Sequence, residues 1–380
     1  MTDPAIAARH DSDPHDPHDR PGTPPPTVIK LRGPADLLEM VPYLFGFRPT
    51  ESLVAVSIKP GRNRVGVQLR ADLGPASEDR GFPAYVASLF KRERADSAVL
   101  VVYTEAPTDP DRLPAWSLVS AVREALAAER IELRDALCVR DGRWWSYVCA
   151  DPSCCPPEGT VLPADSASRV AAEATVAGLQ VLPDRNALAE SLRPVGFLGR
   201  LGVNQAIDRA LAERAEELAA AEEQAPQAVA EVWRRHRRVA RRRLWAAAER
   251  AYAGEWLTDA EVGELSVALS DIATRDSCVS WDPRTRGEAA QALWIQLARR
   301  ADLCFDATPM FLVAWTAWRC GNGALAQIAL ERTLEADPGY SFALLLDEAL
   351  DRAVNPAVLD GEPKWNRRGP SSSRRRGKRR

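Results

Sequence analysis

Residues 97–149 read SAVLVVYTEAPTDPDRLPAWSLVSAVREALAAERIELRDALCVRDGRWWSYVC, and this stretch decides the expected fold. It begins with SAVLVVYTE, a short apolar run rich in valine that is typical of a buried strand. LPAWSLVSAVREALAAERI follows with the spacing of a long amphipathic helix. ELRDALCVRDGRWWSYVC then predicts a hairpin, because Asp141-Gly142 is a two-residue turn signal between two strand-like segments. Strands that alternate with helices predict an α/β unit, and the hairpin makes its sheet mixed.

The same alternation extends toward the N-terminus. Three segments there predict strands, namely TVIKL (27–31), SLVAVSIK (52–59) and RVGVQLRADL (64–73), and the turn PGRN joins the last two. Two segments between and after them predict helices, namely ADLLEMVPYLFGF and FPAYVASLFKRERA. Pro42 indicates that the first of these helices is short or kinked.

After Pro163 the pattern changes to helices, which predicts a second, all-α domain. Thr258 with Glu261 three residues later predicts a helix that starts with a capping box. The last helices resemble tetratricopeptide-like hairpins through Ala314, Ala326, Leu330 and the closing Asp337-Pro338, although a plain helical bundle fits equally well.

We therefore expect four parts. These are a disordered acidic, proline-rich tail (1–26), an α/β domain (27–165), a helical domain (166–357) and a disordered basic tail (358–380).

Composition excludes several classes of protein. The chain has 380 residues, a net charge of −3 and no apolar run near the ~18 residues that a membrane span requires. The polar start does not resemble a secretory signal, and seven cysteines do not make a secreted disulfide framework. We expect a cytoplasmic protein that does not bind membranes.

The most reactive segment follows the hairpin and reads CADPSCCPPEGTVLP (149–163). We call Cys149–Glu158 the thiol loop. It contains three thiols and two carboxylates, and these are the first candidates for a ligand or redox site: Cys149, Asp151, Cys154, Cys155 and Glu158.

Four interpretations of the thiol loop remain open. It could be a rigid proline-braced connection, a redox switch, a metal site or a nucleophilic centre. Three thiolates with Asp151 are weak metal ligands here, because the spacing is not that of a zinc knuckle and adjacent Cys154 and Cys155 point apart in most backbones. We predict no metal and no cofactor.

Histidine limits the nucleophilic interpretation. The only histidine outside the N-terminal tail is His236, and a thiol nucleophile usually needs a nearby base. A carboxylate pair such as Asp135 or Asp151 with Glu158 remains as an acid/base alternative.

A second group of polar residues lies at predicted strand ends and on the hairpin. Arginines at the ends of strands can bind phosphate or carboxylate groups, or they can form simple ion pairs with neighbouring acids. The members are Arg48, Ser52, Arg70, Asp72, Arg143 and Trp145. No glycine-rich phosphate loop follows a strand, which excludes the common nucleotide sites.

Two basic segments complete the candidates. VWRRHRRVARRRLW (232–245) predicts a helix with an arginine-rich face, and we expect the acidic helix upstream to pair with it. The C-terminal tail carries nine Lys or Arg in its last seventeen residues, which could tether nucleic acid without sequence specificity. The strongest candidates there are Arg374, Arg375, Arg376, Lys378, Arg379 and Arg380.

Three segments carry a resemblance to a known family. LLEMVPYLFGFRPTESLVAVSI, LRADL and SYVCADPSCCPPEG resemble an actinobacterial family named only as domain of unknown function 4192, over most of the ordered chain. The resemblance implies no established activity and no catalytic residues.

The leading hypothesis is a non-enzymatic interaction or regulatory protein with a ligand- or redox-sensitive pocket at the thiol loop. A protein partner would bind through the helical domain. The alternatives are an enzyme of unrecognised type that uses a loop thiol with a carboxylate, and a nucleic-acid-associated factor tethered by the basic tail.

Overall fold

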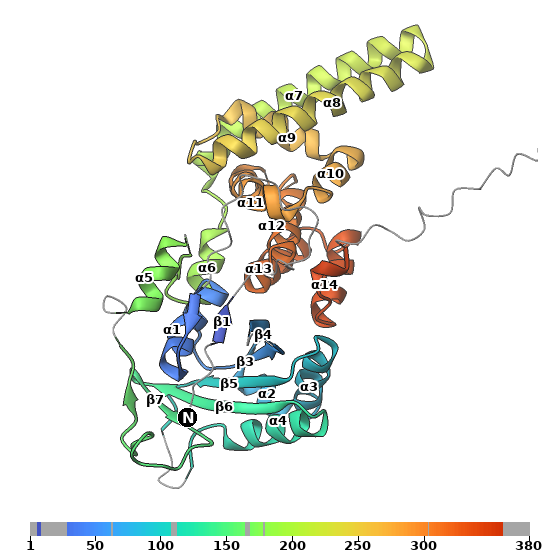
Figure 1. The fold of residues 1–380 in the computed structure, drawn as a ribbon. Helices are drawn as coiled ribbons and strands as arrows, with labels where there is room; N and C mark the ends of the chain where they lie inside the picture. The colour runs from blue at the N-terminus through green and yellow to red at the C-terminus, as the bar shows by residue number, and fades with distance from the viewer. Residues whose placement is uncertain are drawn as a thin grey trace, which may run out of the picture. The chain divides into compact units, whose positions relative to one another are not determined.

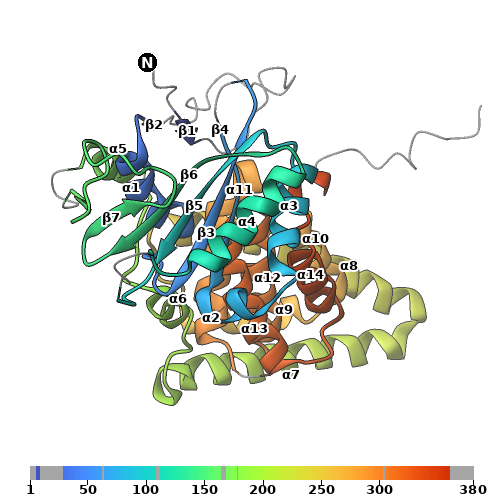
Figure 2. The same ribbon diagram turned by 90° about the horizontal axis from the view of Figure 1, so that it is seen from below.

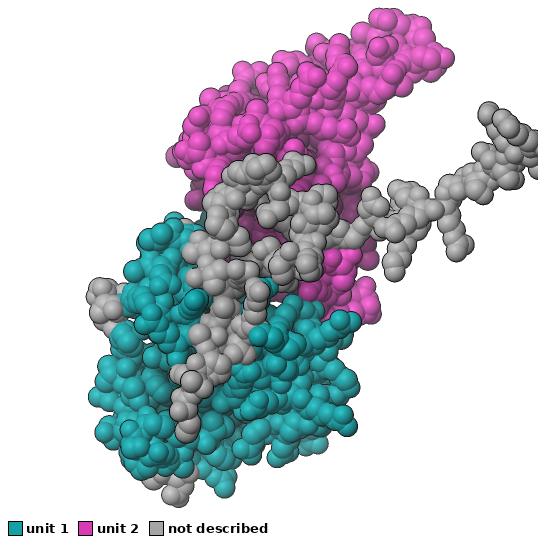
Figure 3. Space-filling view, in the orientation of Figure 1, with its two compact units in different colours: residues 1–193 teal, residues 194–380 magenta. Residues whose placement is uncertain are grey.

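The computed structural model describes residues 6–8, 29–61, 64–107, 112–163, 168–177, 179–302 and 304–359. It divides the chain into two compact units, Met1–Arg193 and Pro194–Arg380 (Figure 3). Each unit has its own buried core.

The first unit is built on one mixed sheet with the strand order β2-β1-β4-β3-β5-β6-β7-β8 (Figures 1 and 2). Its strands are β1 (Ile6–Ala8), β2 (Ile29–Leu31), β3 (Ser52–Lys59), β4 (Arg64–Asp72), β5 (Ser97–Tyr103), β6 (Glu132–Arg140), β7 (Arg143–Ser146) and β8 (Thr160–Val161). Seven consecutive residues of β3 and six of β5 are buried, so side chains on both faces of these central strands are covered.

Strand directions follow from the connections. β3 is antiparallel to β4 and β5, whereas β5 and β6 are parallel and are joined through helix α4 (Trp116–Ala128). β6 and β7 form the predicted hairpin, in which Asp141 and Gly142 both have positive φ, 49° and 69°. Two positive φ values characterise the primed turn that this dipeptide favours.

Helices flank the sheet. They are α1 (Pro34–Phe45), α2 (Leu73–Glu78), α3 (Phe82–Arg92), α4, α5 (Arg169–Val176) and α6 (Arg185–Ser191). α3 and α4 lie side by side on one face of the sheet, and α1 packs with α5 (Figures 1 and 2). α1 continues past Pro42 to Phe45 before Gly46 ends it in a left-handed conformation.

The boundary between the units differs from the expected one after residue 165, because α5 and α6 belong to the first unit. Arg169 at the start of α5 forms an ion pair with Asp36 and donates to the carbonyl of Lys30. Phe47 and Leu182 form a parallel bridge. These long-range contacts attach the segment to the sheet unit, and they leave no local signal in the sequence.

The second unit is helical. It contains α7 (Phe197–Gln224), α8 (Pro226–Tyr252), α9 (Asp259–Leu269), α10 (Ile272–Val279), α11 (Pro283–Arg300), α12 (Ala307–Arg319), α13 (Gly323–Ala336), α14 (Ser341–Asp351) and the short 3₁₀ helix η2 (Pro356–Leu359). The long helices α7 and α8 run side by side (Figure 1). Ala225 is extended between them because it precedes Pro226, which starts α8 at a position where proline is favoured.

The predicted fold class is confirmed as a mixed sheet with flanking helices and a large helical part. The predicted capping box is also present, since the Thr258 side chain accepts from the Glu261 N–H and the Glu261 carboxylate accepts from the Thr258 N–H. α12 and α13 form a helical hairpin across Cys320–Asn322. Their likeness to tetratricopeptide units stays a prediction.

The tails are described only in part. Within the expected N-terminal tail, the structure describes only β1, which pairs with β2 and β4, and the expectation of disorder for the tail stays a prediction. The rest of that tail and the candidate tether from Arg374 to Arg380 lie outside the described residues. Over the described part of the chain, every helix is too short or too polar to cross a bilayer.

Candidate functional site

The thiol loop connects β7 to the edge strand β8, and side chains of the hairpin hold its start. The Ser146 hydroxyl accepts from the backbone N–H of Cys149 (3.1 Å) and donates to the Asp135 carboxylate (3.0 Å). Burial raises the pKa of Asp135. The first residue of the loop is therefore tied through Ser146 to the neighbouring strand β6.

The end of the thiol loop is held by two further side chains of β7. The Trp145 indole N–H donates to the Pro157 carbonyl (2.9 Å), and the Arg143 guanidinium donates to the Gly159 carbonyl (2.9 Å). Gly159 has a φ of 79°, and a Cβ placed there would lie 2.5 Å from the Trp145 ring. Only glycine fits both the conformation and the close approach of the indole.

A tight turn brings the three sulfurs together. The backbone N–H groups of Cys154 and Cys155 both donate to the Asp151 carbonyl, at 3.2 and 2.8 Å. In such a helix-like turn, successive side chains diverge by about 100° rather than the ~180° of a strand. Adjacent cysteines can then face the same space, contrary to the expectation that they point apart.

The resulting cluster is compact. The sulfurs of Cys149 and Cys154 are 3.1 Å apart, those of Cys154 and Cys155 are 3.5 Å apart, and all three lie within 4.8 Å of one another. Cys154 is exposed, and Cys149 and Cys155 are partly exposed. The thiols are therefore accessible and mutually in contact, and they are not packed into the core.

The three thiols differ in acidity. Hydrogen bonds from the Cys154 thiol and from the Asp151 backbone N–H lower the pKa of Cys149 below the ordinary value for a thiol. The hydrogen bond with Cys149 raises the pKa of Cys154, and burial raises the pKa of Cys155 to about 12. Cys149 is thus the thiol that most readily forms a thiolate, which is the reactive form.

The two carboxylates of the thiol loop do not join the sulfurs. Asp151 accepts from the Ser153 N–H (2.9 Å) and hydroxyl (2.7 Å), and these hydrogen bonds lower its pKa. Glu158 contributes its backbone carbonyl, which accepts from Arg143 at 3.4 Å. Asp151 therefore shapes the turn. Among the described contacts there is no hydrogen bond between Asp151 and Glu158, the pair that was predicted for acid/base chemistry.

A small hollow lies directly before the thiol loop. Its volume, including open solvent, is about 210 Å³, and it is lined by Trp116, Val119, Ser120, Arg123, Leu133, Tyr147 and Val148. Tyr147 donates to the Pro114 carbonyl (2.5 Å), and its ring lies 6.1 Å from that of Trp116. Sequence reasoning missed this hollow because Trp116 lies about thirty residues upstream, on a helix whose pattern carries no sign of the contact.

The predicted strand-end group separates into two places. Arg143 and Trp145 hold the thiol loop, as described above. Ser52, Arg70 and Asp72 lie instead where the carboxyl end of β5 meets β3 and β4, since Ser52 pairs with Asp72 and with Tyr103. β6 runs parallel to β5, so the Asp141-Gly142 turn after β6 lies at the same end of the sheet as this group. The thiol loop begins at the opposite end of β7 and therefore lies at the other end of the sheet.

Most members at this strand end have structural partners. Arg70 forms an ion pair with Asp72 (2.5 Å) and lies over the Phe47 ring at 5.8 Å. Ser52 is the exception, because it is completely buried and its hydroxyl has no hydrogen-bond partner among the described residues. Arg48 donates its backbone N–H to Leu182 (3.1 Å). The ion-pair interpretation of Arg70 and Asp72 is confirmed.

The same strand end carries acids that the sequence analysis did not select. The Glu51 carboxylate accepts from the Thr104 hydroxyl (3.0 Å) and from the Glu105 N–H (2.7 Å). Burial and a hydrogen bond with Asp141 raise the pKa of Glu105. Glu51 has a φ of 40°, an uncommon conformation for a residue other than glycine.

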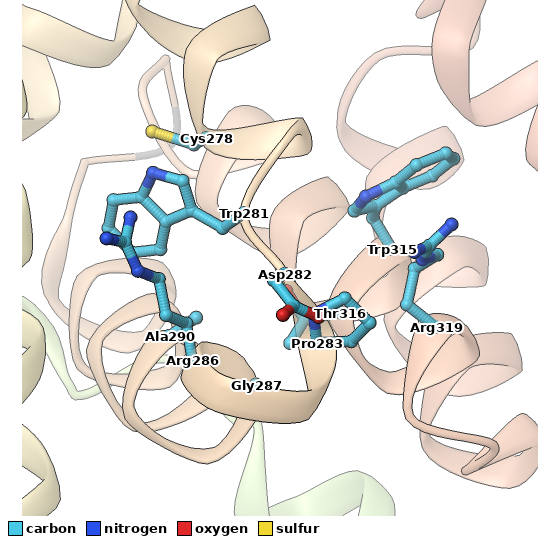
Figure 4. A pocket seen from close by; sticks show the side chains of 10 residues that line it. All are labelled: Cys278, Trp281, Asp282, Pro283, Arg286, Gly287, Ala290, Trp315, Thr316 and Arg319. Atoms are coloured by element: carbon cyan, nitrogen blue, oxygen red, sulfur yellow. The ribbon is translucent and has the colours of Figure 1, made fainter. Parts of the chain in front are cut away.

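The helical unit has its own hollow of about 220 Å³, a volume that includes open solvent. Figure 4 shows the side chains that line it. Trp281 and Arg286 lie on one side of it, and Trp315 and Arg319 lie on the other (Figure 4). Cys278 also borders it, and burial raises the pKa of this thiol to about 12. None of the predicted site residues line this hollow.

The basic helix α8 pairs internally, as predicted. Arg235 and His236 both contact Glu217 of α7, at 2.5 and 2.7 Å, and Arg237 pairs with Asp271 at 2.9 Å. The imidazole of His236 is therefore engaged by a carboxylate of its own unit.

Together, the fold and the site define a protein with a mixed-sheet α/β unit that presents three clustered thiols on a braced edge loop, followed by a helical unit. The chain belongs to the family described as "Domain of unknown function (DUF4192)", which matches residues 34–357. No curated protein and no solved structure matches the chain.

Proposed function

We propose that the protein is a non-enzymatic regulatory or interaction protein of the cytoplasm, and that its thiol loop responds to oxidants. The observation that carries this proposal is the distance of 3.1 Å between the accessible sulfurs of Cys149 and Cys154. A disulfide bond is ~2.05 Å long, so a shift of about 1 Å within one loop would join them.

The chemistry of the switch needs a peroxide as oxidant. The Cys149 thiolate attacks one peroxide oxygen, becomes a sulfenic acid, and releases water or an alcohol. The sulfur of Cys154 then attacks the Cys149 sulfur, a disulfide forms, and water leaves. The lowered pKa of Cys149 supports its role as the attacking thiol.

The hollow beside the thiol loop supports a binding role. The hollow is open to solvent and its enclosed part, about 10 Å³, has room for only about one water molecule, so it suits a surface contact with a partner protein better than an enclosed small-molecule substrate. Tyr147 and Val148 line the hollow and directly precede Cys149. A disulfide that pulls on Cys149 would therefore change the shape of the hollow.

The enzymatic alternative has less support. All four histidines lie outside residues 29–193, and the Asp151 carboxylate is engaged by Ser153. Seven cysteines, an odd number, are not typical of a secreted disulfide framework, which supports the cytoplasm. The hairpin of α12 and α13, if it acts as a tetratricopeptide-like unit, would offer a second surface for a protein partner.

Peroxide treatment of the full-length protein tests the proposal. We expect intact and peptide mass spectrometry to show a Cys149–Cys154 bond that a reductant reverses, because these two sulfurs are accessible and in contact. Cys154→Ser should leave Cys149 as a trappable sulfenic acid. Cys304→Ser is the matched control, since Cys304 is exposed and lies in the other unit.

Two results would contradict the redox proposal. One is a wild-type protein in which Cys149 and Cys154 remain free thiols while Cys304 is oxidised. The other is a Cys149–Cys154 bond that forms equally fast in the urea-unfolded chain, since the folded loop would then contribute nothing.

A further inference from the structure

The thiol loop places three soft donor atoms where one cation could contact all of them. A metal–sulfur bond of ~2.3 Å in tetrahedral geometry separates two sulfur ligands by about 3.8 Å. The Cys149–Cys154 and Cys154–Cys155 sulfur separations, 3.1 Å and 3.5 Å, are slightly shorter than this value, and all three sulfurs lie within 4.8 Å of one another. Small side-chain rotations would therefore complete a three-sulfur site.

We propose that Cys149, Cys154 and Cys155 bind one thiophilic d¹⁰ metal ion, with Zn²⁺ as the representative, through three thiolates. The inference rests on the proposed function in one respect, namely that the same loop is the functional one. The metal ion would compete with the oxidant for the same thiols.

The donor set decides the class of metal. Thiolates select zinc, copper(I) and similar ions, whereas Mg²⁺ and Ca²⁺ need oxygen ligands. The nearest carboxylate in the loop, that of Asp151, is held by the Ser153 N–H and hydroxyl and is not part of the cluster. A hard cation would find no suitable ligands at this position.

The backbone around the sulfurs is already organised for binding. The Asp151 carbonyl accepts from the N–H groups of Cys154 and Cys155, which closes the turn that carries two of the sulfurs. Ser146 holds the Cys149 backbone, and Trp145 holds Pro157. Ligands that are fixed before binding lose less conformational entropy when the metal arrives.

Three protein ligands leave one position of a tetrahedral ion open. Because Cys154 is exposed, an ion can reach the site from solvent. A water molecule or a donor atom from a partner would occupy the fourth position, as in zinc sites that keep an exchangeable ligand.

Binding and oxidation exclude each other at the same atoms. Zn²⁺ displaces the thiol protons and occupies the sulfur lone pairs, so bound ion protects Cys149 from peroxide. Formation of the Cys149–Cys154 bond removes two of the three ligands and releases the ion. The loop would therefore couple metal occupancy to oxidant level.

The test uses reduced, metal-free full-length protein. Zn²⁺ is titrated in competition with a chromophoric chelator, and Cd²⁺ in parallel reports sulfur-to-metal charge transfer in the ultraviolet. We expect one ion per chain, and a loss of affinity of at least about tenfold in Cys149→Ser, Cys154→Ser and Cys155→Ser, because each removes one of three ligands. Cys304→Ser should bind like wild type, and circular dichroism of each metal-free variant verifies its fold.

The outcomes separate this inference from the redox proposal. Tight Zn²⁺ binding that slows peroxide oxidation supports both. A peroxide-dependent Cys149–Cys154 bond without Zn²⁺ binding, or with equal binding in wild type and Cys155→Ser, overturns the metal site and leaves the redox proposal standing. Binding that never affects oxidation supports the metal site and counts against the coupled switch.

Discussion

At the scale of single residues, the thiol loop depends on a few positions whose role is geometric. Gly159 allows a positive φ of 79° and the close approach of Trp145, and Ser146 joins the loop to Asp135. None of these side chains is itself reactive. They hold the sulfurs in mutual contact, and a substitution there should act on the thiols indirectly.

Gly159→Ala tests this dependence. The new Cβ would lie 2.5 Å from the Trp145 ring at a left-handed φ, so we expect a loss of about 1–3 kcal/mol in the free energy of unfolding and weaker Zn²⁺ binding. Gly142→Ala is the matched control, because its φ of 69° is also positive but no atom lies within 4 Å of the new Cβ. Urea unfolding measures both, and equal losses would show that the indole contact contributes little.

At the scale of secondary structure, the helical unit is stabilised by local features that a sequence can carry. The capping box at Thr258 and Glu261 starts α9, and Arg250 of α8 forms an ion pair with the same Glu261 at 2.5 Å. One carboxylate therefore joins a helix start to a neighbouring helix. Hydrogen bonds from Arg250 and from the Thr258 N–H lower the pKa of Glu261 to about 2.

This lowered pKa predicts a dependence of stability on pH. A carboxylate that is more acidic when folded stabilises the protein above its unfolded pKa, here near 4.5, and this contribution disappears as the pH falls toward 2. We expect Glu261→Gln to flatten the fall in urea midpoint between pH 5 and pH 3. Glu264→Gln, on the same helix and paired with Arg243, is the control. A control that flattens the curve equally would contradict this assignment.

At the scale of the whole molecule, the chain consists of two compact units of similar length. The first has a sheet core around β3 and β5, and the second has a helical core that includes Trp294 and Phe311. A unit with its own buried core is expected to fold by itself.

Separate expression of residues 1–193 and 194–380 tests this independence. We expect both fragments to be folded by circular dichroism and to unfold cooperatively in urea, since each retains its own core. The fragment 1–193 should retain the reactivity of the Cys149–Cys154 pair toward peroxide. A fragment that is unfolded in isolation would show that its core needs the other unit.

The sequence alone determined those features that depend on neighbouring residues. The apolar run SLVAVSIK before the PGRN turn placed Ser52–Lys59 as a strand with both ends correct, Asp141-Gly142 produced the primed hairpin turn, and Thr258 with Glu261 produced the capping box. Each of these follows from steric and hydrogen-bonding preferences within a few residues. The thiol loop was also recognisable, because its composition is unusual by itself.

Only the tertiary structure decided how distant residues combine. The boundary lies after Arg193 because Arg169 and Leu182 contact the sheet unit, and the hollow beside the thiol loop requires Trp116 from α4. The convergence of the sulfurs depends on the backbone of one turn, and the loop that contains it is held at its far end by Trp145 and Arg143, which lie 12 and 16 positions from their partners. Such contacts join residues far apart in the chain, and no local pattern of amino acids encodes them.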